Sequence, residues 1–207
     1  MNRFIQTLLT LPLLAVLACG TVVDRTKAAL VRVSHIGVQM THFGPVSGVT
    51  ICSGWSVADG LILTANHCIG EAAEQMLVDG VSASVIKRDE YYDLALLKSN
   101  LHKRVLYFRD TPVAYGDRVT GIGYGFGWTQ PLVLTHPVLL ANQSIGARQA
   151  AGIITNGEWV TGMSGGPVVD YAGRVVSMIQ QFYMGQGYGV GTTMMKAFLL
   201  DAGVIGL

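Results

Sequence analysis

Three short segments of the sequence carry side chains that together could perform nucleophilic catalysis. His67 lies in the segment TANHC, Asp93 directly precedes the apolar run LALLK, and Ser164 lies in the glycine-rich segment GMSGGP. A serine hydroxyl becomes a nucleophile when an imidazole takes its proton and a buried carboxylate orients that imidazole. The three segments therefore predict a nucleophile, Ser164, with His67 as its general base and Asp93 as the orienting acid.

Each of these residues also has an ordinary structural interpretation. A lone histidine is more often structural than catalytic, an aspartate is common in the turn before a strand, and a serine is common in a glycine-rich turn. His67 is distinguished by its neighbour, because a disulfide between Cys68 and Cys52 would fix the loop that carries the imidazole. A general base must lie within about 3 Å of the group that it deprotonates, so such anchoring favours the catalytic interpretation.

The glycines around Ser164 indicate a second element of the same chemistry. They permit a turn in which the backbone N–H groups of Gly162 and Ser164 converge to form an oxyanion hole, and loss of one such donor costs about 3 kcal/mol. The segment also fits the G-x-S-x-G pattern of α/β-hydrolases, the class of many lipases and esterases, in which the histidine follows the serine in the chain. The last histidine here is His136, which excludes that class.

The N-terminal segment predicts export from the cell. Arg3 is the only charged side chain before Ala18, and the apolar run between them is shorter than the roughly 20 residues that a membrane-spanning helix needs. The run closes on VLACG, which resembles the bacterial lipobox, in which Cys19 would carry lipid and become the mature N-terminus. An ordinary secretory signal cleaved nearby, with no role for Cys19, is the alternative.

We accordingly expect a signal peptide at residues 1–18, a tether at residues 19–28, and a lipoprotein anchored by its lipid to a membrane of the cell envelope, on the periplasmic or extracellular face. If Cys19 carries lipid, the other two of the three cysteines remain as a pair. In an oxidising compartment Cys52 and Cys68 can form a disulfide, which would stabilise the fold by roughly 3 kcal/mol.

Charge and composition argue against several classes of function. Without residues 1–18 the chain has 13 basic and 13 acidic side chains, so it lacks the positive charge that binds nucleic acid. The glycine-rich run at residues 121–127 lacks the Lys-Ser/Thr pair of a phosphate-binding loop. Four histidines have no ligand-like spacing with one another or with cysteines, so neither a metal nor another cofactor is expected; they are His35, His42, His102 and His136.

Short β-type runs separated by glycine, asparagine and aspartate make up most of the chain, and this spacing predicts antiparallel barrels or sandwiches. The runs fall into two blocks, which predicts two β-barrels of similar size at residues 29–110 and 111–207. Helix is expected at Thr193–Ala202 and, for a turn or two, over Cys68–Gln75. The expected strands are Leu30–Val33, Val49–Ser53, Gly54–Val57, Leu61–Thr64, Gln75–Val78, Ala83–Arg88, Leu94–Lys98, Arg118–Tyr124, Val133–Ala141, Gly152–Ile154, Pro167–Asp170, Val175–Gln181 and Gly189–Thr192.

The chain resembles the chymotrypsin/trypsin family of serine proteases in three signatures, which are TANHC, DLALL and GMSGGP in that order. The interval from Cys52 to His67 resembles the family's disulfide around its catalytic histidine, and the similarity covers residues 29–203. The resemblance implies an all-β fold of two antiparallel six-stranded barrels with the active site between them and a short C-terminal helix, as in a compact bacterial member. It also implies a monomeric serine endopeptidase that cleaves protein or peptide substrates through an acyl-enzyme without a cofactor.

The resemblance also implies a substrate pocket. Ser177 lies in the segment that resembles the strand lining the substrate cleft, and Gly189 in the one that resembles the pocket wall. Glu158 would lie at the base of the pocket and favour Lys or Arg in the substrate, because opposite charges attract in a partly desolvated site. Ile179 would instead narrow the pocket and favour a small apolar side chain. We favour the basic preference and keep the apolar one as its alternative.

Two departures from the family pattern concern activation. Digestive members begin with Ile-Val-Gly-Gly, whose freed amine pairs with an aspartate just before the catalytic serine. This chain lacks that start and has Met163 at the aspartate's place. We expect an enzyme that needs no such cleavage, with its oxyanion loop held by packing or ordered by substrate or a partner. A catalytically silent binding protein on this fold, and an esterase on the same scaffold, are the alternatives.

Overall fold

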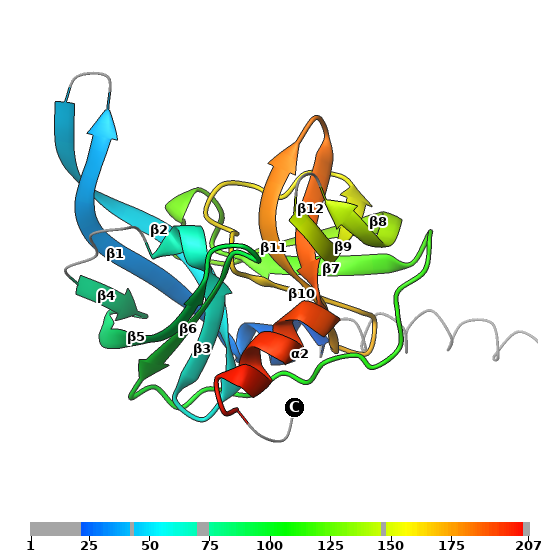
Figure 1. Ribbon diagram of the computed structural model, residues 1–207, viewed down its shortest axis with the longest axis horizontal. Coiled ribbons are helices and arrows are strands. Elements are labelled where there is room, and N and C mark those ends of the chain that lie inside the picture. The colour runs from blue at the N-terminus through cyan, green and yellow to red at the C-terminus, as the bar shows by residue number, and fades with distance from the viewer. Residues whose placement is uncertain (1–21, 42–43, 70–74, 146–147, 205–207) are drawn as a thin grey trace, which may run out of the picture.

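The computed structural model describes residues 22–41, 44–69, 75–145 and 148–204, which form two closed antiparallel barrels of six strands each (Figure 1). The prediction of an all-β fold with two such barrels is confirmed. In order around the first barrel, the strands are β1 (Leu30–Thr41), β2 (Gly44–Ala58), β3 (Leu61–Ala65), β6 (Leu94–Ser99), β5 (Val81–Asp89) and β4 (Gln75–Val78). The second barrel contains β10 (Pro167–Val169), β11 (Val175–Tyr183), β12 (Gln186–Gly191), β9 (Arg148–Asn156), β8 (Leu132–Ile145) and β7 (Arg118–Gly123).

Strands β1 and β2 form a long hairpin that rises above the rest of the first barrel (Figure 1). The sequence pattern predicts two strands that meet at Gly54, whereas β2 continues through this residue without a break. A Cβ atom at Gly54 would lie only 2.9 Å from the carbonyl oxygen of Leu63 on β3. The glycine therefore marks a close approach of two strands, and not the turn that glycine often indicates.

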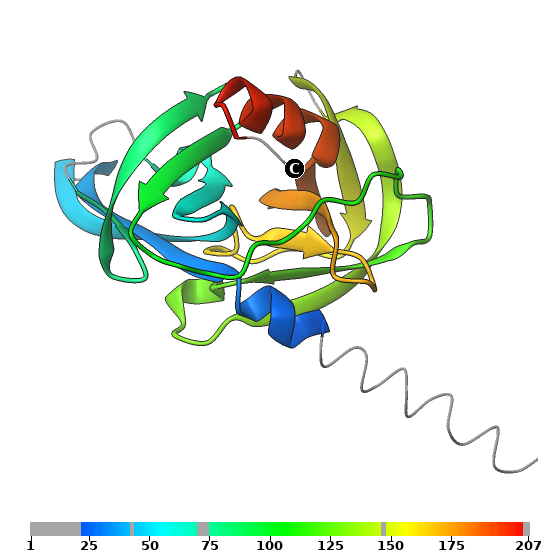
Figure 2. The same cartoon turned by 90° about the horizontal axis from the view of Figure 1, so that it is seen from below.

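The C-terminal helix packs against both barrels. Helix α2 (Thr192–Asp201) follows β12 directly and lies across the junction of the barrels, as Figure 2 shows. Its buried residues Met195, Phe198 and Leu199 belong to one apolar cluster with Trp55 of the first barrel and Val190 of the second. Burial of each large apolar side chain contributes about 1.5–3 kcal/mol, so this short helix stabilises the arrangement of both barrels.

The helix predictions agree with the structure at the C-terminus but only in part near Cys68. Helix α2 lies within one residue of the predicted Thr193–Ala202. Of the helix predicted over Cys68–Gln75, the described residues show only the end of a short 3-10 turn, η1 (Asn66–Cys68). Residues 70–74 lie outside the described residues.

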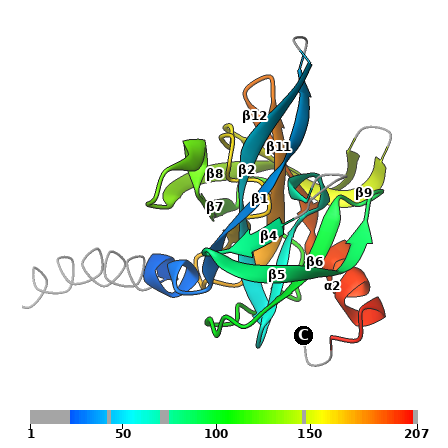
Figure 3. The same ribbon diagram turned by 90° about the vertical axis from the view of Figure 1, so that its left-hand side faces the viewer.

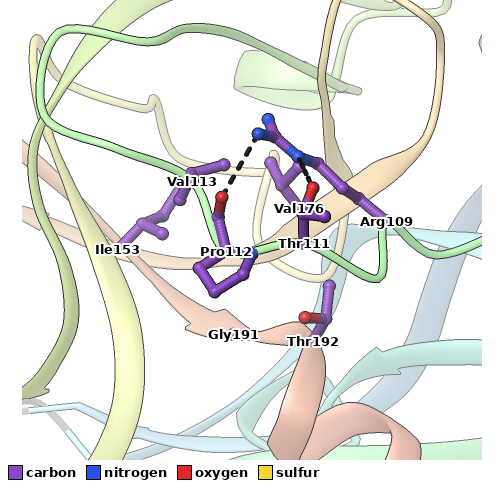
Figure 4. Close-up of a pocket in the computed structure, with 8 residues that line it drawn as sticks. All are labelled: Arg109, Thr111, Pro112, Val113, Ile153, Val176, Gly191 and Thr192. Carbon is purple, nitrogen blue, oxygen red and sulfur yellow. Dashed lines mark hydrogen bonds between the residues drawn. The ribbon is translucent and has the colours of Figure 1, made fainter.

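The connection between the barrels runs from the end of β6 to the start of β7, and the predicted boundary at residue 110 falls within it. Arg109 fixes this connection, since its guanidinium donates to the Thr111 hydroxyl (3.0 Å) and to the Pro112 carbonyl oxygen (3.2 Å), as Figure 4 shows. The small cavity that these residues line has a volume of about 10 Å³, enough for a single water molecule. It is therefore a packing feature of the barrel end and not a ligand site.

Residues 22–27 form a helix at the start of the described chain (blue in Figures 2 and 3). Thr26 in this helix is fully buried, and its hydroxyl donates to the Val22 carbonyl oxygen (2.9 Å). Part of the predicted tether at residues 19–28 is thus folded onto the domain. The predicted signal peptide at residues 1–18 and Cys19 lie outside the described residues. Among the described residues, no helix combines the length and the apolar character that crossing a membrane requires.

Candidate active site

Strand pairing in the first barrel brings His67 and Asp93 to the same place. His67 lies in η1, which directly follows β3, and Asp93 directly precedes β6. Strands β3 and β6 are antiparallel neighbours in which Ala65 pairs with Leu94, so the end of one strand lies beside the start of the other. The backbone N–H of Asn66 donates to the Asp93 carbonyl oxygen (3.1 Å) and closes this junction.

The Asp93 carboxylate holds His67 through two hydrogen bonds. Its Oδ2 lies 2.8 Å from His67 Nδ1, and its Oδ1 accepts from the His67 backbone N–H, also at 2.8 Å. Asp93 is only 6% exposed, whereas the His67 side chain is 48% exposed. Because an ionised carboxylate can only accept hydrogen bonds, Nδ1 carries the proton of the neutral imidazole. The second nitrogen, Nε2, is thereby left as the basic atom of His67.

A disulfide anchors the turn that carries His67. Cys52 on β2 is bonded to Cys68 in η1, with their Cα atoms 6.0 Å apart, and both residues are buried. The carbonyl oxygen of Cys68 lies 2.9 Å from Nδ1 of the buried His35. Cys52, His67 and Cys68 lie close enough together to suggest a metal site, but the two sulfur atoms are bonded to each other. The bonded pair offers no thiolate, so the donor set does not fit a metal.

The glycine-rich loop of the second barrel presents two free backbone donors. The Thr161 carbonyl oxygen accepts from the Phe126 N–H (2.7 Å), and in a trans peptide the N–H of Gly162 points the opposite way. Gly162 has φ +93°, a conformation that glycine adopts without strain. Met163 N–H and Gly165 N–H donate to backbone carbonyls, whereas the N–H groups of Gly162 and Ser164 have no acceptor among the described residues.

Ser164 lies against the first barrel beside the His67 turn. Its carbonyl oxygen is 3.8 Å from Cys68 Sγ, and its hydroxyl donates to the Gln180 carbonyl oxygen (3.2 Å). The side chain of Gln180 in turn donates to the carbonyl oxygen of Tyr92 (2.6 Å), the residue before Asp93. No hydrogen bond joins Ser164 to His67 among the described residues. Such contacts are often incomplete in enzymes without substrate.

Asp93 and His67 thus form a pair in the first barrel, and Ser164 of the second barrel lies beside the turn that carries His67. Residues 52–178, which include all three, match the family of trypsin-like peptidase domains. The chain belongs to this family.

Curated relatives of this trypsin-like peptidase domain share a single name, probable periplasmic serine endoprotease DegP-like. The Brucella suis relative is 34% identical over 144 residues, which is 64% of this chain and 28% of the relative. The Bartonella henselae relative is 33% identical over 169 residues, 76% of this chain and 33% of the relative. The chain therefore matches only about a third or less of the length of these relatives.

Solved structures share the fold at lower sequence identity. An HtrA-type protease with a decapeptide superimposes with a TM-score of 0.76 at 20% identity, over 89% of this chain and 67% of that protein. The active form of the Rv3671c protease from M. tuberculosis gives a TM-score of 0.80 at 18% identity, over 92% of this chain and 87% of that one. At these identities the likeness shows the fold alone.

In this trypsin-like domain the residue before the serine is buried and apolar. Met163 is fully buried in a cluster that includes Trp159 and Val160. A Cβ atom at Gly123 of β7 would lie 2.9 Å from the Met163 Cα, so the strand passes directly over this residue. Packing thus occupies the place at which the digestive enzymes form their ion pair.

An apolar cavity of about 180 Å³ opens beside Ser164. Trp159 is one of the residues that line it, and the ring of His136 packs against Trp159 with the ring centres 4.9 Å apart. Burial lowers the pKa of His136, so neutral imidazole is favoured behind the pocket. The residues that line the cavity are Trp159, Val160, Thr161, Ser164, Ile179, Gln180, Gln181 and Phe182.

The resemblance predicts four pocket residues, which are Glu158, Ser177, Ile179 and Gly189, and the structure places them differently relative to this cavity. Only Ile179 of the four lines the cavity. Glu158 is exposed, and its Oε1 accepts from the Gly185 N–H (2.9 Å) at the turn between β11 and β12. Ser177 is fully buried behind the pocket, where its hydroxyl donates to the Val190 carbonyl oxygen (2.8 Å) and Gly189 packs against it.

The residues that sequence reasoning missed follow Ile179 on β11. Gln180, Gln181 and Phe182 begin where the strand changes from fully buried residues to exposed ones. This change from apolar residues to two glutamines is the signal that the sequence offered. A backbone hydrogen bond brings this part of β11 to the glycine-rich loop, because the Ile179 carbonyl oxygen accepts from the N–H of Gly165, the residue after Ser164 (2.7 Å).

The histidines outside the site are held in ordinary contacts. His102 lies 2.7 Å from an Asp59 carboxylate oxygen at the exposed surface, and His35 and His136 are packed as described above. His42 lies outside the described residues. The expectation of no metal and no cofactor stays a prediction.

Proposed function

We propose that this chain is an exported serine endopeptidase in which Ser164 is the nucleophile, His67 the general base and Asp93 the orienting acid. The observation that carries the proposal is the Asp93–His67 pair, at 2.8 Å, beside a loop whose Gly162 and Ser164 N–H groups lack acceptors among the described residues. A buried acid, a basic nitrogen, a hydroxyl and two free donors are the groups that acyl transfer requires.

In the proposed mechanism Ser164 Oγ attacks the peptide carbonyl while His67 Nε2 takes its proton. The N–H groups of Gly162 and Ser164 donate to the oxygen that becomes negative in the tetrahedral intermediate. His67 then gives its proton to the leaving amine, and an acyl-enzyme forms on Ser164. Asp93 keeps the Nδ1 proton in place and stabilises the imidazolium, and water releases the acyl group by the same steps in reverse.

We further propose a preference for small or medium apolar side chains in the pocket. Trp159, Val160 and Ile179 supply an apolar lining, and Glu158 is engaged at the hairpin turn outside it. A basic side chain in this cavity would lose its hydration without gaining a carboxylate, which is unfavourable. This replaces the basic preference that the spacing of Glu158 suggested.

A labelled fluorophosphonate together with a peptide library tests the function. We expect the probe to label Ser164, since it reacts with an activated serine, and the library to show cleavage after apolar residues. Amide and ester substrates of the same sequence, compared in parallel, separate a peptidase from an esterase.

The matched control is the variant Glu158→Gln, which changes a charge next to the pocket. Its cleavage profile should equal that of the wild type. A wild-type protein that is folded but neither labelled nor active would support the silent binding protein and contradict the proposal.

All the groups of the proposed site come from one chain and meet without a second copy. His67 and Asp93 come from the first barrel, and Gly162 and Ser164 come from the second. We therefore propose that a monomer is sufficient for activity on a protein or peptide substrate.

For location, we propose export to the cell envelope with lipid on Cys19. The relatives above are named periplasmic, and the apolar N-terminal run closes on VLACG. The helix at residues 22–27 begins three residues after Cys19, so the lipid would hold the domain close to the membrane surface. Two or three acyl chains give stable anchoring, whereas one alone is marginal.

Replacing Cys19 with serine tests this anchoring. We expect radioactive fatty acid to label the wild type but not Cys19→Ser, and the variant to leave the membrane fraction or stay uncleaved. Hydrolysis per mole of protein should persist, because Cys19 precedes the first barrel. Absence of label on the wild type would refute lipidation, and equal label on both proteins would place the lipid elsewhere.

A further inference from the structure

We propose that Ser53, a residue of the first barrel, is a positioning residue that holds the oxyanion loop of the second barrel. The inference rests on the proposed function, because it assigns a role toward the N–H groups of Gly162 and Ser164. Ser53 lies on β2 directly after Cys52 and is fully buried.

The polar groups of Ser53 are all engaged, and two of them contact the oxyanion loop. Its hydroxyl donates to the Gly162 carbonyl oxygen (2.8 Å), and its backbone N–H donates to the Ser164 carbonyl oxygen (2.8 Å). Its hydroxyl oxygen also accepts from the Tyr124 N–H (2.8 Å), and its own carbonyl oxygen accepts from the Thr64 hydroxyl (2.7 Å). One serine therefore joins β2, β3, the end of β7 and the loop of the nucleophile.

These contacts fix the peptide planes around the oxyanion donors. The Ser164 N–H belongs to the peptide that joins Met163 to Ser164. The Gly162 carbonyl belongs to the peptide before it and the Ser164 carbonyl to the peptide after it, and Ser53 donates a hydrogen bond to each of these carbonyls. The Gly162 N–H belongs to the peptide whose carbonyl, from Thr161, accepts from Phe126. The turn that contains Phe126 is itself held to the Ser53 hydroxyl through Tyr124. The peptide of the Ser164 N–H is held directly by the Gly166 N–H, which donates to the Met163 carbonyl oxygen (2.9 Å), and Ser53 holds the peptides on both sides of it. Ser53 thus restrains the segment in which both oxyanion donors lie.

The loop has no charged group that could replace this role. Residues 161–167 have no ionisable carboxylate or amine, and Met163 packs where an ion pair would otherwise form. Neutral hydrogen bonds and packing must therefore orient the donors. Donors that are already oriented need no reorganisation while negative charge develops on the substrate oxygen. Their geometry therefore affects the free energy of the transition state more than that of the bound substrate.

The surroundings of Ser53 leave no room for a substitute. A Cβ atom at Gly123 would lie 2.8 Å from the Ser53 hydroxyl oxygen, and one at Gly165 would collide with the Ser53 carbonyl oxygen. In Ser53→Ala the Gly162 carbonyl and the Tyr124 N–H would therefore lose their partner.

The experiment compares Ser53→Ala with Ser56→Ala, a matched control. Ser56 is also fully buried on β2, and its hydroxyl donates to the Ala58 carbonyl oxygen (3.0 Å), away from the loop. We expect Ser53→Ala to lower kcat by about 100-fold with KM nearly unchanged, as loss of one oxyanion donor does. Affinity for a peptide aldehyde, whose adduct places an oxyanion in the hole, should fall by a similar factor. Ser56→Ala should keep the wild-type kcat.

The pH profile distinguishes a positioning role of Ser53 toward the oxyanion loop from a disturbance of the whole active site. Ser53 does not contact the His67–Asp93 pair, so the pH midpoint of kcat/KM should stay at its wild-type value in Ser53→Ala. A kcat within about twofold of the wild type, or an equal loss in Ser56→Ala, would overturn the proposal. An inactive wild type would instead contradict the proposed function, and it is measured first.

A second variant covers the case in which Ser53→Ala does not fold. Ser53→Gly keeps the backbone N–H contact to Ser164 and introduces no atom that could clash. It should show the same selective loss of kcat in the folded protein. If neither variant folds, Ser53 stabilises the whole domain and the assignment as a positioning residue is refuted.

Discussion

Replacing Ser164 with alanine is expected to lower kcat for peptide hydrolysis by about 10⁶-fold. The hydroxyl is the attacking group in the proposed mechanism, and no other described side chain at the site could take its place. The fold should persist, because within the described part of the chain the hydroxyl makes one hydrogen bond, to the Gln180 carbonyl oxygen at 3.2 Å. The backbone contacts of the loop to Ser53 and Ile179 do not involve the side chain.

His67→Ala should cost a similar factor, and the double variant should cost little more than either single one. A nucleophile and its base act as one unit, so removal of one member already removes the contribution of the other. Initial rates with one peptide substrate, measured on the wild type, both single variants and the double variant, give the comparison. Losses that multiply in the double variant would contradict a shared nucleophile–base pair.

Replacing Asp93 with asparagine is expected to lower kcat by about 10⁴-fold while leaving the structure intact. Asp93 has φ +55°, a left-handed conformation in which asparagine is as readily accommodated as aspartate. The side-chain oxygen of asparagine can still accept from the His67 backbone N–H, as Oδ1 does in the wild type at 2.8 Å. The amide NH₂ group then faces His67 Nδ1.

An NH₂ group that donates to Nδ1 changes the tautomer of the imidazole. Nδ1 becomes the acceptor, so the proton of the neutral ring moves to Nε2, which can no longer take the proton of Ser164. Rates at neutral pH and the rate of fluorophosphonate labelling should therefore fall together. NMR of the imidazole nitrogens reports the tautomer directly.

Asp89→Asn is the matched control for this substitution. Asp89 accepts from the Tyr92 N–H (2.8 Å) in the same turn and does not contact the imidazole. Its replacement should leave kcat within a few-fold of the wild type. If Asp93→Asn retained most of the activity, the Asp93–His67 pair would be structural and the proposed triad would be wrong.

Local pattern in the sequence determined the type of fold and indicated the three groups that we propose to react. Short alternating runs and turn residues predict antiparallel barrels, because side chains alternate between the faces of a strand with a period of two. The histidine, aspartate and serine each lie at the end of an apolar run or in a glycine-rich turn, so their local sequence marks them. The disulfide pair follows from the count of cysteines, and the structure joins Cys52 to Cys68.

The tertiary structure decided which residues surround the nucleophile. Strand β11 contains two register shifts, one opposite Val168–Val169 and one between Ile179 and Gln181, where Gln180 is the extra residue. A bulge adds a residue to one strand only, so counting along the sequence from a matched motif no longer gives the correct partner. The resemblance placed Ser177 and Gly189 at the pocket, whereas the structure buries Ser177 and places the Gln180 carbonyl oxygen 3.2 Å from the Ser164 hydroxyl.

The role of Ser53 is likewise visible only in three dimensions. Its sequence neighbours mark it as an ordinary strand residue, and the residues that it contacts lie 71 and 109 positions away along the chain. Hydrogen bonds between remote segments depend on how two separate barrels dock, and no local propensity encodes that docking. The sequence therefore indicated the groups that we propose to react, and the packing of the barrels decided what holds the glycine-rich loop and what lines the cavity beside Ser164.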